Sequence, residues 1–132
     1  MTAWLRFGKF NLVGIAGAAV QLSLIALLTK SFDLRAGLAA AIAVEVAILH
    51  NFAWHERFTW RDRTADSSPL VRLLRFHAAN GTVSLIGNAV LVDLFVERCG
   101  FPVVLSGLAA ILICALVNFR LADRWVYRGT AE

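Results

Sequence analysis

The sequence predicts an all-α integral membrane protein of four transmembrane helices, built as two tandem parallel two-helix repeats. Of the 132 residues, 59% are hydrophobic and 17% are charged, which leaves too little polar surface for a soluble domain. Four nearly uncharged stretches approach the ~20 residues that a helix needs to cross ~30 Å of hydrocarbon. They lack the alternation of barrel strands, and helices satisfy their own backbone groups in lipid.

The helices are predicted near residues 8–29, 37–55, 71–96 and 103–121. The first follows two basic residues and resembles a signal sequence, but its counterpart in the second half indicates that it is retained. Glu45 is the charged residue that interrupts the second. Ser68 suits an N-cap and Pro69 suits the first helical position, so together they predict the start of the third helix.

A doubled sequence pattern indicates the tandem repeat. Asn51-Phe52 followed by Glu56-Arg57-Phe58-Thr59-Trp60-Arg61 returns as Asn118-Phe119 followed by Asp123-Arg124-Trp125-Val126-Tyr127-Arg128. Upstream, Arg6-Phe7 with Asn11 matches Arg75-Phe76 with Asn80. We expect one domain over residues 1–132, with repeats near 6–61 and 73–128 and a polar loop near 56–72.

The basic residues predict the orientation, because Lys and Arg are retained on the cytoplasmic side during insertion. Ten lie at the two termini and in the middle loop, and three lie in the opposite loops. Both termini are therefore expected in the cytoplasm, and two spans per repeat place both repeats in the same sense. The net charge of +4 follows from this topology and from attraction to anionic lipids, so no nucleic-acid partner is expected.

Glu45 is the leading candidate for a functional residue inside the membrane. A charged side chain at mid-membrane costs about 3 kcal/mol on insertion scales, so the carboxyl group is expected to face the bundle interior or a wet cavity. One interpretation is that it binds substrate or a coupling proton. The other is a protonated carboxyl group hydrogen-bonded to Gln21 or Asn88.

Small and amide side chains form stripes on the first and third helices. They are Asn11, Gly14, Gly17, Ala18 and Gln21 on the first, and Asn80, Ser84, Gly87 and Asn88 on the third. Such stripes are typical of helix packing in membranes. A polar path through the interior is the alternative.

The repeated ends carry aromatic and basic residues that fit an interfacial belt with topogenic arginines. That interpretation explains the residue classes but not their repeated order, which suggests a built site. Arg57 and Arg124 can present their guanidinium groups to a phosphate. Glu56 and Asp123 would hold these arginines in place, and Asn51 and Asn118 lie in the preceding turn.

Enzymatic and metal chemistry are not expected. His50 and His55 stand five residues apart, about 140° around a helix, and cannot both ligate one ion from it. The order His-Glu-x-x-His is absent, as are a nucleophile-and-base set and a phosphate-cradling glycine loop. No cofactor is expected.

The chain resembles the GtrA-like family of small four-span membrane proteins over nearly its whole length. The matching motifs are Arg6-Phe7, Gly14, Gly17, Asn51-Phe52, Arg57-Phe58-Thr59-Trp60, Asn118-Phe119 and Arg124-Trp125-Val126-Tyr127. It departs from the family pattern at Gln21, where an Asp is common, at Glu45, which is the membrane acid instead, and at His50 and His55.

The resemblance implies a flippase of the bacterial cytoplasmic membrane that translocates a polyprenyl-phosphate-linked sugar for cell-surface polysaccharide synthesis. The phosphate would meet Arg57, Arg75 and Arg124, and the sugar hydroxyls would meet Gln21, Asn88 and Glu45. Four short helices enclose little volume, so a homodimer is expected. The alternatives are a non-transporting anchor for a membrane glycosyltransferase and, less favoured, a proton-coupled exporter.

Overall fold

The computed structural model describes residues 1–64 and 67–128. Throughout these ranges the regular elements are helices, and no strand occurs. Four of the helices are long and apolar enough to cross a membrane: Ala3–Ser31, Leu38–Thr59, Pro69–Glu97 and Val104–Val126. The prediction of an all-α protein with four spans is confirmed.

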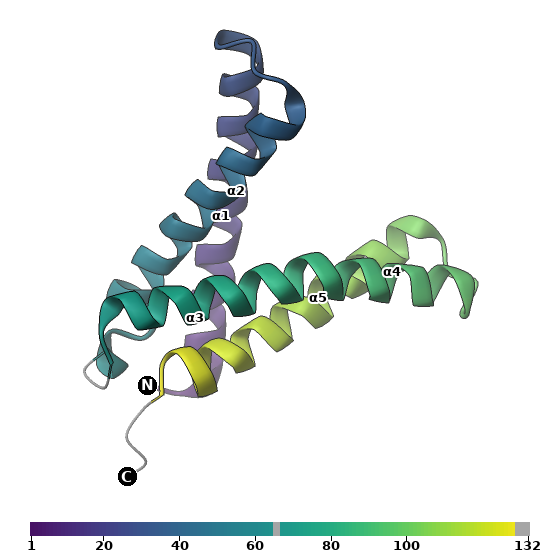
Figure 1. Cartoon of the computed structure of the whole chain (residues 1–132). Helices are drawn as coiled ribbons and strands as arrows, with labels where there is room; N and C mark the ends of the chain where they lie inside the picture. Colours follow the sequence, from purple (N-terminus) through teal and green to yellow (C-terminus); the bar gives the residue numbers. More distant parts are fainter. Residues whose placement is uncertain (65–66, 129–132) are drawn as a thin grey trace. The chain divides into compact units, whose positions relative to one another are not determined.

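The chain divides into two compact units between Asp62 and Arg63, and each contains one helical hairpin. In the first hairpin, α1 (Ala3–Ser31) packs against α2 (Ala36–Trp54), as Figure 1 shows. A π-helical turn, η1 (His55–Thr59), extends α2. The short 3-10 turn η2 (Arg61–Arg63) then carries the chain into the second unit.

The second hairpin pairs an interrupted helix with a continuous one. Its first helix consists of α3 (Pro69–Thr82), the π-helical turn η3 (Val83–Gly87) and α4 (Asn88–Glu97). Its second helix is α5 (Val103–Leu121), extended by the π-helical turn η4 (Ala122–Val126). α5 packs against α4 and η3 along its length (Figure 1).

The start of α3 follows the predicted capping chemistry. The Ser68 hydroxyl accepts a hydrogen bond from the Val71 N–H at 3.4 Å, and Pro69 occupies the first turn, where a missing N–H leaves no bond unmade. The predicted cap is confirmed.

The turns between the paired helices share one conformation. Each contains a residue with positive φ, Asp33 at 51° and Gly100 at 68°. In each, the next N–H reaches back six residues: Leu34 donates to the Leu28 carbonyl at 3.1 Å, and Phe101 to the Phe95 carbonyl at 3.0 Å. The bonds satisfy carbonyl groups that the helix end leaves open.

The second helix of each hairpin packs through small residues at four-residue spacing. The buried positions are Ala39, Ala43 and Ala47 in α2 and Ser106, Ala110 and Cys114 in α5. Small side chains allow helix backbones to approach closely, which increases van der Waals contact where lipid removes the hydrophobic drive between helices.

An asparagine of the second helix marks a close approach in both hairpins. A Cβ atom added at Gly17 would lie 2.6 Å from Cγ and Nδ2 of Asn51, so the amide fills the space over that glycine. In the second hairpin Asn118 Nδ2 instead donates to the Ser84 hydroxyl at 3.3 Å. The two contacts join corresponding positions, 67 residues apart.

Burial changes the predicted match between the first helices. Arg6 and Phe10 are buried in α1, and Arg72 and Phe76 are buried in α3. Arg75, which the sequence pattern paired with Arg6, is only half-buried. Matched by burial, corresponding positions at the start of the two hairpins are therefore 66 residues apart, and not 69. The π turn η3 contains one extra residue, so the separation becomes 67 residues from Ser84 onward.

Substitution of Gly17 tests the contact with Asn51. Gly17→Ala places a methyl group inside the amide and should lower the free energy of unfolding by about 1–3 kcal/mol, the usual result of overpacking. Gly14→Ala is the matched control on the same helix, because an added Cβ there has nothing within 4 Å. Denaturation by SDS in mixed micelles measures both variants, and equal stabilities would contradict the close approach.

Candidate functional site

The two hairpins end in the same local structure. In each, an aromatic residue follows the π turn and donates its N–H to the first carbonyl of that turn at 2.8 Å: Trp60 to His55, and Tyr127 to Ala122. Both aromatic side chains are completely buried. The belt interpretation is therefore wrong for Trp60 and Tyr127, although Trp54 remains exposed as a belt residue would be.

In the first hairpin Trp60 belongs to a buried aromatic cluster. His55 stacks on Phe10 with ring centroids 5.0 Å apart, and Trp60 meets His55 edge-on at 5.1 Å. Nδ1 of His55 is hydrogen-bonded to the Thr59 hydroxyl at 3.0 Å. The cluster joins the start of α1 to the end of α2, so His55 contributes to the packing of this hairpin.

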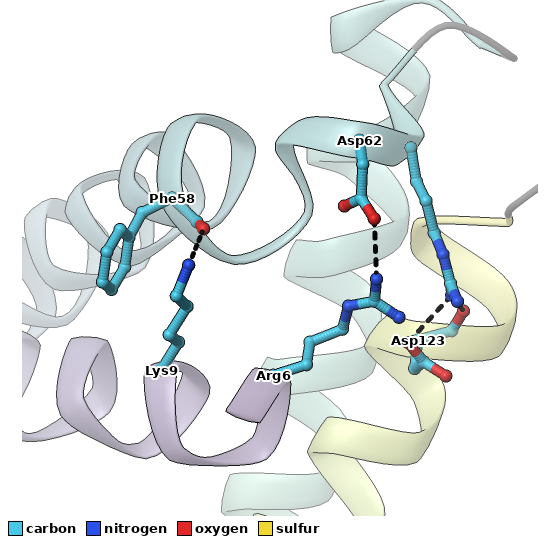
Figure 2. Close-up of polar contacts among 6 residues, drawn as sticks. Arg6, Lys9, Phe58, Asp62 and Asp123 are labelled. Atoms are coloured by element: carbon cyan, nitrogen blue, oxygen red, sulfur yellow. Dashed lines mark hydrogen bonds and ion pairs between the residues drawn. The ribbon is translucent and has the colours of Figure 1, made fainter. Parts of the chain in front are cut away.

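Two cations of α1 reach the end of the hairpin in Figure 2. Arg6 donates to Asp62 Oδ2 at 2.8 Å, and Lys9 donates to the Phe58 carbonyl at 3.3 Å. The Lys9 ammonium also lies 4.4 Å from the centre of the Phe58 ring. The Arg6 side chain is 5% exposed and that of Asp62 is 50% exposed.

The second hairpin uses its arginines differently. Arg63 donates to Asp123 Oδ1 at 2.9 Å and to the Asp123 carbonyl at 3.3 Å. Arg72, which is buried, donates to the backbone carbonyls of Thr64, at 2.6 Å, and Ser67. Asp123, which was predicted to hold Arg124, thus forms an ion pair with Arg63.

The predicted phosphate-binding arginines remain at the surface. Arg57 and Arg124 are exposed, and each precedes a second exposed arginine by four residues, Arg61 and Arg128. Arg75 is half-buried. Each hairpin thus presents one pair of arginines at the end that carries its π turn.

Two of the predicted amide side chains contact the same residue, Ser84, in the second hairpin. Asn88 Nδ2 donates to the Ser84 carbonyl at 2.8 Å, on the residue whose hydroxyl accepts from Asn118. The Asn118 Oδ1 atom is buried, and within the described residues it has no hydrogen-bond partner. Asn88 also lines an open hollow of about 510 Å³ along α4, together with Ala89, Val92, Asp93 and Val96.

The remaining predicted residues lie in the first hairpin. Asn51 covers Gly17, and its Oδ1 lies 3.2 Å from Nδ1 of His50. Gln21 is half-buried. Glu45 is exposed, so the expectation of an interior carboxyl group is not met within its hairpin. Its position is two residues beyond Ala43, which places it about 200° around α2 from the packed face.

The sequence did not predict the contacts made by four residues: Arg6, Asp62, Arg63 and Arg72. One signal was present. Arg-x-x-x-Phe occurs at Arg6-Phe10 and at Arg72-Phe76, and its four-residue spacing places both residues on one helix face. The hydrogen-bond partners of these arginines depend on how the turns fold, so the local sequence does not predict those partners.

A model of the GtrA/DPMS transmembrane domain matches residues 9–129. The chain belongs to this family. None of the curated proteins matches it significantly. The resemblance inferred from the doubled motifs is thereby confirmed, and the match includes both hairpins and both π turns of the second helices. Arg6 lies just before the matched range.

Arg72 and Arg75 provide a matched test of which arginine supports the fold of this GtrA/DPMS-family protein. Arg72→Ala removes a charged donor from two carbonyl groups and should lower the free energy of unfolding by about 1–3 kcal/mol. Arg75→Ala should change it by less than about 0.5 kcal/mol. Thermal unfolding in detergent compares the two, and a larger loss for Arg75→Ala would contradict the burial register.

Proposed function

We propose that the protein translocates a polyprenyl-phosphate-linked sugar across the cytoplasmic membrane during synthesis of a cell-surface polysaccharide or glycan. The observation that carries the proposal is that some arginines bond within the protein and others are exposed. Arg6, Arg63 and Arg72 make internal bonds, whereas the pairs beginning at Arg57 and Arg124 are exposed at matching positions of both hairpins. Exposed guanidinium forks at a membrane surface suit a phosphate group.

Family membership supports the general setting, a membrane protein linked to lipid-carried sugars. We place both termini in the cytoplasm of a bacterial cell, because ten basic residues lie on that side and three on the other. We also treat the hairpins as tandem repeats inserted in the same sense. The matching turns, buried stripes and π-helical ends, all 67 residues apart, support this assignment.

The sugar is proposed to move along amide and carboxyl groups of the helices while the prenyl chain stays in lipid. Asn88 and Asn118 contribute from the second hairpin, and Gln21, Glu45 and Asn51 from the first. The Asn118 oxygen, buried without a donor among the described residues, is suited to accept a hydroxyl hydrogen bond. We assign these residues to binding and none to catalysis.

A homodimer is proposed to complete the path. Large apolar side chains are exposed along the helices of both hairpins, among them Ile15, Leu85, Val104 and Leu112. Four short helices can enclose little volume, and a second copy would supply further walls. Glu45 would then be covered by a neighbouring helix instead of lipid.

The second candidate is a non-transporting partner that anchors a polyprenyl-phosphate glycosyltransferase. The position of Glu45 favours it, because the residue lies on the face of α2 opposite the buried alanines, where a second membrane protein can pack. The exposed arginines would then bind anionic lipids and fix the height of the enzyme in the membrane.

Reconstituted liposomes test the proposed transport. The wild-type protein should expose a labelled polyprenyl-phosphate sugar on the opposite leaflet, and the double variant Arg57→Ala/Arg124→Ala should slow this about tenfold or more, because charged hydrogen bonds contribute about 1.5–3 kcal/mol. Arg98→Ala, an exposed arginine at the other end of its hairpin, is the control and should retain the rate.

Glu45→Leu separates the two candidates. A transporter that uses the carboxyl group should lose transport while still inserting, whereas an anchor should bind its glycosyltransferase through a contact that this change weakens. Absence of transport by the wild-type protein, together with retained binding to a glycosyltransferase, would reject the translocase and leave the anchor.

A further inference from the structure

We propose that Arg6 is a phosphate-binding residue whose site is occupied by Asp62 until a phosphate group displaces it. The inference rests on the proposed function, because it takes the phosphate of a lipid-linked substrate as the entering anion. It adds a deeper position to the exposed arginine pair of the first hairpin and assigns a regulatory role to Asp62.

The unequal burial of the two partners is the first argument. The Arg6 side chain is 5% exposed, and that of Asp62 is 50% exposed, although their atoms are 2.8 Å apart. A buried guanidinium requires a compensating anion at all times, since an unpaired buried charge is strongly destabilising. The half-exposed carboxylate can return to water at little cost. The geometry therefore permits exchange of one anion for another over a fixed arginine.

The surroundings of Arg6 suit phosphate better than a single carboxylate. Lys9 lies three residues further along α1, on the same side of the helix, and its ammonium donates to the Phe58 carbonyl. In Figure 2 both side chains extend from α1 toward the segment that bears Phe58 and Asp62. Asp62 lies in the three-residue turn η2 and directly follows the exposed Arg61. A phosphate bound at Arg61 would thus be held by the residue that precedes Asp62 in the chain.

Arg72 of the second hairpin, which matches Arg6 by burial, also donates to the backbone carbonyls of Thr64 and Ser67. In the Arg63–Asp123 ion pair both side chains are similarly exposed, at 28% and 26%. Of the Arg6–Asp62 and Arg63–Asp123 pairs, the first is therefore the one that joins a buried cation to a half-exposed anion.

Asp62→Asn tests the proposal in the full-length protein in detergent. Removing the resident anion should tighten binding of polyprenyl phosphate about fivefold, the effect of losing a partly exposed ion pair worth about 1 kcal/mol. The variant should also have a lower melting temperature in phosphate-free buffer and recover it when the lipid is added. Asp33→Asn, which removes the same charge at the opposite turn, should bind like the wild-type protein.

A parallel titration with inorganic phosphate identifies the source of the anion. Tightening confined to polyprenyl phosphate assigns the site to the lipid substrate, and tightening with both assigns it to phosphate groups in general. Arg6→Lys retains the charge but loses the bidentate fork, and it should bind at least tenfold more weakly.

Equal affinities of Asp62→Asn and wild-type protein for both ligands would overturn the exchange, as would full binding by Arg6→Lys. The outcome is separable from that of the transport assay. A binding change without transport by the wild-type protein would reject the translocase and keep the phosphate site, and transport without the binding change would do the reverse.

Discussion

The close approach of two helices within each hairpin is the constraint on which the other features depend. Lipid is as apolar as the helix faces, so association relies on packing and on hydrogen bonds between helices. Alanines of α2 and the small residues of α5 provide the packing, and Asn51 and Asn118 reach the partner helix at Gly17 and Ser84. This register brings Phe10 onto His55 and Arg6 onto Asp62.

The π-helical ends determine which side chains at the end of each hairpin are buried and which are exposed. A turn with i→i+5 bonds changes the direction of the residues that follow it, compared with a continued α-helix. Trp60 and Tyr127 become fully buried, while Arg57 and Arg124 stay exposed one turn earlier. The same short motif therefore closes the hairpin and presents a cation at its end.

The two hairpins are similar in backbone and different in chemistry. His55 stacks in an aromatic cluster where the second hairpin has Ala122, and Gly17 faces an amide where the second has Ser84. Arg6 bonds to a carboxylate, whereas Arg72 bonds to backbone carbonyls. One hairpin therefore sets a buried arginine against a half-exposed carboxylate, and the other sets a buried arginine against backbone carbonyls.

The sequence by itself determined the membrane setting, the four helices, the Ser68 cap and the family. These are predictable because hydropathy, span length, capping and motif order are local or additive properties of the chain. The tertiary structure decided the rest. Helices α2 and α5 are apolar on nearly every side and do not reveal which face packs, so the exposure of Glu45 depended on the rotation of α2. The burial of Arg72 and the Arg63–Asp123 ion pair depended on how the turns fold. The π turns at the hairpin ends coincide with the repeated motif, but the motif did not predict their i→i+5 hydrogen bonds.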